Sequence, residues 1–309
     1  MRKKKIREVG IVGIGYVGSA MERFFDDRGD IALSLYDEFR TQSENFTSMN
    51  GYRKAFGSGE RNHFGDFDPI PLRELKIQRD VFSKNLDLAV ICVPTPSLPD
   101  EGCDTSIVES CVKWLRERDV PRILIKSTVE PGTTERLIQK YGDGIAFSPE
   151  FGGNSSYWTP FSFDHDFKDA GWHIFGGRKE TTSWLVDLWT EIAGPMKHYF
   201  QTDPTTAEMV KYAANCFYAT KVAFVDELAQ LCDDIGVDYT ELREMWTQDP
   251  RISKMHTARF RKSPGFSESH CFNKDVPALI SFAERFGGNL STLRGALEAS
   301  RRMAQEKDE

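Results

Sequence analysis

The chain has 309 residues, of which 39% are hydrophobic and 28% are charged, and its net charge is -7. That length suits about two domains with a full core, and the acidic balance argues against binding to a nucleic-acid backbone. No apolar run approaches the ~20 residues that cross a bilayer, and the basic opening "MRKKKIR" leads into a strand, not a signal peptide. The six cysteines show no CxxC pair and no metal spacing. We therefore expect a cytoplasmic protein with no metal, membrane or nucleic-acid partner.

Residues 8–25 predict a strand, a glycine turn and a helix, because a Val/Ile-rich segment is followed by glycines and then by apolar residues at helical spacing. Gly13, Gly15 and Gly18 have the spacing GxGxxG. In a dinucleotide-binding turn the first glycine permits a tight bend, the second lets the backbone approach a pyrophosphate, and the third lets the helix pack on the strand. A glycine-rich turn without a ligand has the same spacing, so the motif alone is weak evidence.

A second strand is expected over residues 31–37, ending at Asp37, 24 residues after Gly13. A carboxylate at this place would accept hydrogen bonds from an adenosine ribose and would repel the 2′-phosphate of NADP. Arg40 is the one nearby residue that favours NADP. Together these features predict NAD as the cofactor, bound by Gly13, Gly15, Tyr16, Val17, Gly18 and Asp37.

Further strands are expected at residues 86–96, 122–128, 145–148 and 172–177, with helical stretches between several of them. Strands alternating with helices predict an α/β fold with a Rossmann-type doubly wound parallel sheet. Residues 41–75 lack a clear period and are expected to form an irregular excursion. We predict an NAD-binding domain over residues 1–203 and an all-helical domain over residues 204–309.

A long helix is predicted from Thr205 to Ile235, where Thr205 and Glu208 have the spacing of a capping box. Lys211 and Asn215 are four residues apart and therefore share one helical face. An ammonium and an amide aimed at one oxygen would stabilise a developing oxyanion. An isolated pair of this kind is also common on a solvated helix surface. The helix is apolar on more than one side, which predicts a homodimer formed through it.

Six segments of the chain resemble, in the same order, those of the UDP-glucose/GDP-mannose dehydrogenase family. They are "VGIVGIGYVG", "ICVPTP", "IKSTVEPGTTERL", "FSPEF", "AEMVKYAANCFYATKVAFVDELAQLC" and "HCFNKDVPAL". The resemblance covers nearly the whole chain. It implies that the C6 alcohol of a nucleotide sugar is oxidised to a carboxylate with two NAD and a covalent thioester on a cysteine.

The resemblance also assigns roles to individual residues. It makes Cys271 the nucleophile, whereas the local sequence alone favours a free cysteine packed as a small hydrophobe. Further roles that it implies are oxyanion binding for Lys211 and Asn215, proton transfer for Asp275, a place near the nicotinamide for Thr128 and Glu150, and contact with the cofactor for Thr95, Thr128 and Lys274.

The chain departs from the family pattern in three places. Family members carry a third, nucleotide-sugar-binding domain that this sequence does not contain, so we expect a truncated member. Asn154 stands where the family has a glutamate that assists thioester hydrolysis, and an amide cannot act as a general base. The glycine-rich loop before the cysteine reads "GFSESHC", so side chains replace hydrogens where the substrate would approach.

Three hypotheses follow from the sequence. The first is an NAD-dependent sugar dehydrogenase that uses Cys271 covalently. The second is a two-electron dehydrogenase of the 3-hydroxyacid type, in which Lys211 and Asn215 suffice and Cys271 takes no part. The third is a non-catalytic cofactor-binding subunit. They differ in the NADH formed per product, which is two for the first hypothesis, one for the second and none for the third.

Overall fold

A computed structural model describes residues 7–26, 28–37, 85–151, 167–168, 170–259 and 264–308. The predictions for Arg40, for residues 41–75 and for Asn154 lie outside these residues. The chain divides into two compact units, of which the first comprises Met1–Thr95 and Thr105–Glu208 and the second comprises Pro96–Asp104 and Met209–Glu309. The division therefore falls inside the long helix, a few residues after position 203. Each unit is described by itself below.

The described part of the first unit is built on a seven-stranded sheet with the order β2-β1-β3-β4-β5-β6-β7. Its strands are β1 (Arg7–Val12), β2 (Ile31–Tyr36), β3 (Leu88–Ile91), β4 (Ile123–Ile125), β5 (Ile145–Phe147), β6 (Trp172–Gly177) and β7 (His198–Thr202). Every residue of β3, β4 and β5 is buried, as expected for strands covered on both faces. The predicted doubly wound sheet is confirmed, with one change: β6 runs antiparallel to β5, while the other neighbouring pairs are parallel.

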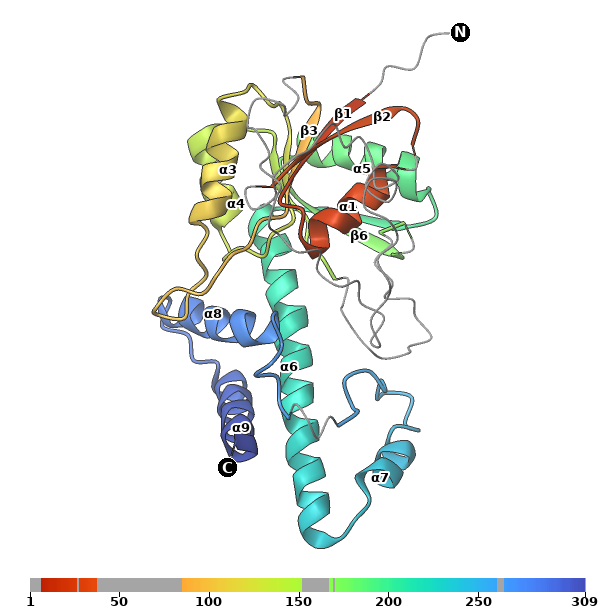
Figure 1. Cartoon of the computed structure of the whole chain (residues 1–309), viewed down its shortest axis with the longest axis vertical. Helices are drawn as coiled ribbons and strands as arrows, with labels where there is room; N and C mark the ends of the chain where they lie inside the picture. Colours follow the sequence, from red (N-terminus) through yellow and green to blue (C-terminus); the bar gives the residue numbers. More distant parts are fainter. Residues whose placement is uncertain are drawn as a thin grey trace. The chain divides into compact units, whose positions relative to one another are not determined.

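Helices cover both faces of this sheet (Figure 1). Helices α1 (Tyr16–Asp26) and α5 (Lys179–Ala193) lie on one face, and α3 (Ser106–Arg116) and α4 (Thr133–Tyr141) lie on the other. The core beneath α1 and α5 is rich in aromatic side chains. Phe24, Phe25 and Trp189 are almost fully buried there, with ring centroids 5.1–5.7 Å apart. This aromatic contact fixes α1, and hence the glycine turn before it, against the sheet.

Strand β7 was not predicted from the sequence. It pairs in parallel with β6 at the edge of the sheet. None of its five residues is buried, so the strand lacks the alternation of apolar and polar residues by which a half-buried strand is recognised. Its backbone hydrogen bonds to β6 define it instead.

The long helix α6 (Pro204–Ile235) confirms the predicted helix, but the predicted capping box is wrong. The helix begins at Pro204, a residue favoured at the first helical position. The side chain of Asp203 caps it by accepting hydrogen bonds from the Thr206 N–H (2.9 Å) and hydroxyl (2.6 Å). Glu208 is fully buried and instead accepts hydrogen bonds from the N–H groups of Gly132 (2.6 Å) and Thr134 (2.7 Å) at the start of α4.

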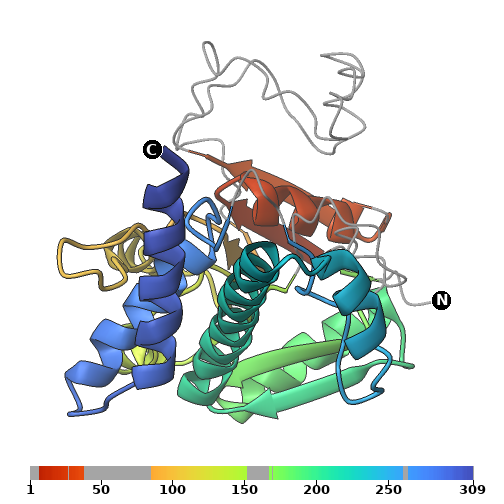
Figure 2. The same ribbon diagram turned by 90° about the horizontal axis from the view of Figure 1, so that it is seen from below.

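In the second unit, α8 (Phe272–Glu284) and α9 (Ser291–Asp308) pack on one side of α6, and α7 (Tyr239–Trp246) packs on the other (Figures 1 and 2). Pro96–Asp104 belongs to the same unit, since Cys103 is buried in the α6–α8–α9 core and Glu101 forms an ion pair with Arg301. Among the described helices, none is both long enough and apolar enough to cross a membrane.

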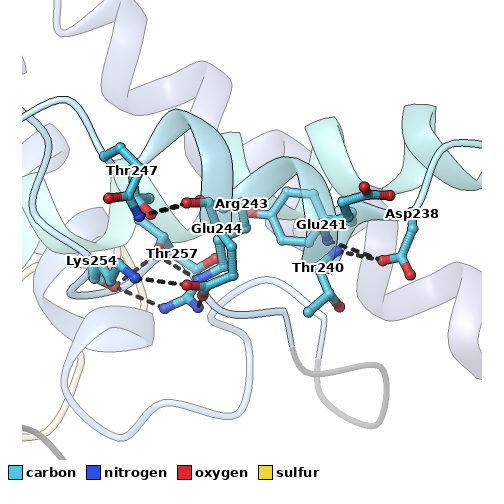
Figure 3. Close-up of polar contacts among 10 residues, drawn as sticks. Asp238, Thr240, Glu241, Arg243, Glu244, Thr247, Lys254 and Thr257 are labelled. Atoms are coloured by element: carbon cyan, nitrogen blue, oxygen red, sulfur yellow. Dashed lines mark hydrogen bonds and ion pairs between the residues drawn. The ribbon is translucent and has the colours of Figure 1, made fainter.

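Polar contacts hold α7 and the loop after it (Figure 3). Asp238 caps α7 by accepting from the N–H groups of Thr240 (2.7 Å) and Glu241 (3.3 Å). Arg243 donates to the hydroxyl of Thr257 at 2.9 Å, which ties the loop back to the helix. Asp238 lies in the same unit as Cys271, although it is far from Cys271 along the chain.

Candidate functional site

The glycine turn lies where the strand order changes direction. The chain runs from β1 to β2 on one side and later returns to β3 on the other side of β1, and such a switch point is where doubly wound sheets bind ligands. Gly13 has φ +88°, and an added Cβ would lie 2.7 Å from the carbonyl oxygen of Cys92. A Cβ on Gly18 would lie 1.9 Å from the Gly13 oxygen, whereas a Cβ on Gly15 would meet no described atom within 4 Å. The turn is therefore tight at its ends and open at Gly15, which fits a pyrophosphate against the backbone.

Asp37 follows β2 and lies beside this turn. Its carboxylate accepts a hydrogen bond from the N–H of Ile14 at 2.7 Å. Tyr16 and Val17 form the first positions of α1, and the Tyr16 side chain is exposed. The predicted cofactor residues of the glycine turn and Asp37 thus lie together at the carboxyl ends of β1 and β2, in an arrangement that fits the adenosine half and the phosphates of NAD.

Thr95 and Thr128 tie together the segments that follow β3 and β4. The Thr95 hydroxyl is buried and donates to the Thr128 carbonyl oxygen at 2.7 Å. The Ser127 hydroxyl donates to the Val93 carbonyl oxygen, also at 2.7 Å. Because the Thr95 proton is engaged in this bond, a contact from Thr95 to a cofactor would use its hydroxyl oxygen as an acceptor.

Lys126 is a buried residue beside the predicted site residue Glu150, and the sequence analysis did not single it out. Its ammonium is buried, 3.3 Å from the Glu150 carboxylate, and donates to the Ser148 hydroxyl (3.3 Å) and the Pro149 carbonyl oxygen (3.4 Å). A lysine at the end of the apolar run "RILIK" was the available signal, because a charge is rarely buried there without a partner. Lys126 thus holds Glu150, which the family resemblance places near the nicotinamide.

Near Lys126, burial changes the pKa of two groups, the Cys92 thiol and the His173 imidazole. It raises the pKa of the Cys92 thiol to about 12, partly offset by Lys126. It also lowers the pKa of His173 to about 3, an effect that the charge of Lys126 increases. At neutral pH the first is a protonated thiol and the second a neutral imidazole, so neither is a candidate nucleophile or acid.

In the second unit, the predicted site residue Asp275 contacts two others, Asn215 and Lys274. The Asp275 side chain is 1% exposed and lies in the first turn of α8. It accepts a hydrogen bond from the buried Asn215 amide of α6 at 2.6 Å, and the Lys274 ammonium lies 2.6 Å from its other oxygen. Asn215 therefore uses one N–H to hold Asp275 and has a second N–H for another acceptor. Lys211 lies four residues before Asn215 on α6 and is half-buried.

Cys271 directly precedes α8, and the Asp275 N–H donates to its carbonyl oxygen at 2.8 Å. All six cysteines are free, and Cys271 is the one that is exposed. The interpretation of Cys271 as a buried small hydrophobe is therefore wrong. Cys216, by contrast, is buried, and burial raises the pKa of its thiol to about 12, with Asp275 adding to the effect.

An apolar stripe runs along the exposed side of α6. Phe217, Phe224 and Leu231 recur at intervals of seven residues, and each is more than half exposed.

Within the part of the chain that the structure describes, no group of three or more His, Cys, Asp or Glu side chains is placed to hold a metal ion.

Two sequence models of one family match this chain. The model for the NAD binding domain of the UDP-glucose/GDP-mannose dehydrogenase family matches residues 72–159. The model for the central domain of the same family matches residues 205–302. The chain belongs to the UDP-glucose/GDP-mannose dehydrogenase family. Its cofactor is NAD, in agreement with the matched NAD binding domain and with the fit of the glycine turn.

Curated members of this dehydrogenase family are similar along most of the chain. UDP-glucose 6-dehydrogenase TuaD of Bacillus subtilis is 25% identical over 96% of this chain and 63% of its own length. The UDP-glucose 6-dehydrogenase of Rickettsia typhi is 29% identical over 71% of this chain and 50% of its own length. Among solved structures, a UDP-glucose dehydrogenase from Pyrobaculum islandicum is 25% identical with a TM-score of 0.75, and the match covers 99% of this chain and 70% of that one. The chain thus spans about half to two thirds of the length of these curated relatives.

Proposed function

We propose that this chain is an NAD-dependent oxidoreductase of the nucleotide-sugar 6-dehydrogenase type. It would oxidise the primary alcohol of a nucleotide sugar to a carboxylate through a thiohemiacetal and a thioester on Cys271. The observation that carries the proposal is the exposure of Cys271 at the start of α8, one turn before the buried Asp275, which pairs with the buried Asn215 and the partly exposed Lys274. NAD, when bound, accepts the hydrides that leave the substrate carbon.

The residues of the chain would act in sequence on that carbon. After the first oxidation the Cys271 sulfur adds to the aldehyde carbon, and the carbonyl oxygen becomes an alkoxide that needs a donor. Lys211 and the second N–H of Asn215 would stabilise this oxygen. Loss of a second hydride converts the thiohemiacetal to a thioester, and water then releases the carboxylate and restores the thiol. Asp275, held by Asn215 and Lys274, would exchange protons through a water.

The stoichiometry of NADH tests this proposal. The purified chain is incubated with NAD and each of several nucleotide sugars, and NADH and sugar product are measured together. We expect two NADH per product for the unaltered chain. We expect at most one equivalent for Cys271→Ser, because a hydroxyl is a poorer nucleophile than a thiolate. Cys111→Ser, at a half-buried cysteine of α3, serves as the matched control. One NADH per product with full activity in Cys271→Ser would instead establish the two-electron dehydrogenase.

We also propose that the chain forms a homodimer through α6 and resides in the cytoplasm. The stripe of Phe217, Phe224 and Leu231 supports the dimer, because apolar side chains at regular spacing are seldom left in water. Six free cysteines support a reducing compartment. Phe224→Glu should give a monomer in light scattering, while Met196→Glu, at a highly exposed position of the first unit, should leave the mass unchanged. A monomeric unaltered chain at micromolar concentration would contradict the dimer.

A further inference from the structure

The loop that leads to Cys271 begins at two residues held by side chains from two different helices. The Gly265 N–H donates to the Asp226 carboxylate of α6 at 2.6 Å, and the Phe266 N–H donates to the Ser300 hydroxyl of α9 at 2.8 Å. Asp226 is 4% exposed and Ser300 is 1% exposed. Two buried acceptors thus receive consecutive backbone donors, so this point of the loop is fixed from both sides.

The space around Gly265 leaves little freedom at this point. Gly265 has φ +70°, in the left-handed region that favours glycine. A Cβ at this position would lie 2.5 Å from the Ser300 hydroxyl oxygen and 2.9 Å from the Ser300 Cα. The side chain of the next residue, Phe266, is buried in the core formed by α6, α8 and α9. The loop therefore enters the core at Gly265–Phe266 and can shift only if these contacts break.

A short series of turns connects this anchored point to Cys271. The Ser269 N–H donates to the Phe266 carbonyl oxygen at 3.0 Å, and the Phe272 N–H donates to the Ser269 hydroxyl at 3.2 Å. The Phe266 and Phe272 rings lie edge to face, 6.4 Å apart. Phe266 and Phe272 therefore hold the segment at both ends, and Cys271 lies directly before the second of them.

We propose that Asp226 and Ser300 are positioning residues for Cys271: by holding Gly265 and Phe266 they fix the loop that carries the sulfur at the start of α8. This inference rests on the proposed function insofar as it concerns catalysis. The second Asp226 oxygen is buried and accepts no hydrogen bond from the described residues. A carboxylate kept in such a place bears a desolvation cost, which the hydrogen bond to Gly265 partly offsets.

The protonation state of Asp226 suits its role as the acceptor for the Gly265 N–H. Burial raises the pKa of the Asp226 carboxyl to about 6, while the Gly265 N–H and the charge of Arg259 lower it. On α7, burial raises the pKa of the Tyr239 hydroxyl, and the charge of Asp226 adds to this effect. At neutral pH Asp226 is thus mainly ionised, and as a carboxylate it is a strong acceptor for the Gly265 N–H.

Four variants test the proposal. Asp226→Ala and Ser300→Ala each remove one acceptor, whereas Asp226→Asn keeps an oxygen for the Gly265 N–H. Asp238→Ala is the control, because it also removes a carboxylate that accepts hydrogen bonds from backbone N–H groups in the same unit, but at α7. If Asp226→Ala does not fold, Ser300→Ala, which removes a single oxygen atom, still tests the anchor.

The first readouts need no substrate. Hydrogen exchange of the peptide spanning residues 264–272 should accelerate about tenfold in both alanine variants, as one buried hydrogen bond is lost. Alkylation of Cys271 by N-ethylmaleimide, followed by peptide mass spectrometry, should become about threefold faster or more, because a released loop hinders the sulfur less. Asp226→Asn and Asp238→Ala should stay near the unaltered chain in both measurements.

Turnover then separates a positioning role from a purely structural one. With an accepted nucleotide sugar, kcat should fall about tenfold or more in Asp226→Ala while the KM for NAD stays within about twofold, since a misplaced reacting group costs rate. Asp226→Asn should restore most of kcat. The proposal is overturned if Asp226→Ala and Asp238→Ala alter Cys271 alkylation equally, or if the loop is released and kcat is unchanged. If the unaltered chain oxidises no nucleotide sugar, the proposed function fails, and the alkylation result still decides whether the anchor positions Cys271.

Discussion

The buried carboxyl group of Glu208 should make the stability of the chain depend on pH. Glu208 is fully buried and accepts hydrogen bonds from Gly132 and Thr134 at 2.6 and 2.7 Å. Gly132 is the N-cap of α4 and has no side chain to cap that helix itself. Burial raises the pKa of Glu208 from 4.5 to about 7, although the hydrogen bonds to the α4 N-terminus lower it. The folded chain therefore binds this proton more tightly than the unfolded chain does.

The sign of the effect follows from that difference. The stability that Glu208 contributes by proton binding is fully present below about pH 4.5 and is lost as pH rises through about 7. At about 1.36 kcal/mol per pKa unit the whole effect is about 3 kcal/mol, and most of it falls between pH 5 and pH 8. Glu208→Gln does not titrate and keeps one acceptor oxygen. Glu208→Ala leaves two N–H donors at the start of α4 unpaired, one of them buried, at a cost of about 2–4 kcal/mol.

Urea unfolding followed by tryptophan fluorescence at pH 5 and pH 8 measures these differences. The free energy of unfolding of the unaltered chain minus that of Glu208→Gln should decrease by about 2–3 kcal/mol between the two pH values. Glu117→Gln, which removes an exposed carboxylate from the same unit, should show no such decrease. A difference that is constant or that grows with pH would refute the reasoning about Glu208.

The remaining predictions concern four residues of the glycine turn and the candidate site. Gly18→Ala places a Cβ 1.9 Å from a backbone oxygen of the turn and should destabilise the first unit by about 3 kcal/mol; Gly15→Ala meets open space, so it should leave the melting temperature unchanged while weakening NAD binding in calorimetry about tenfold. Asp275→Asn removes the partner of a partly exposed ammonium and should cost about 1–3 kcal/mol in urea unfolding, together with most of the NADH production. Lys126→Met leaves the Glu150 carboxylate without its buried ammonium and should cost about 2–4 kcal/mol; an equal loss in Lys126→Arg would show that shape and not charge matters.

Some features of this protein are local, and the sequence alone predicted them. The close approach of Gly18 to the Gly13 backbone is local, so the spacing of the glycines was enough to predict the turn, although the Cys92 backbone that crowds Gly13 is brought there by the fold. The span of α6 depends on apolar residues repeating at helical spacing, and it was predicted to within one residue. The meeting of Asn215 and Asp275 is different, because only the family resemblance assigned both to one site.

Other features were decided by the tertiary structure, because the partners lie far apart along the chain. Glu208 has the spacing of a capping box with Thr205, yet it caps α4, where its partner Gly132 is 76 residues away. Asp226 finds Gly265 at a separation of 39 residues. The sequence shows only that each carboxylate needs either water or a hydrogen-bond donor. Which donor pairs with it depends on the backbone N–H groups that the packed helices bring within reach.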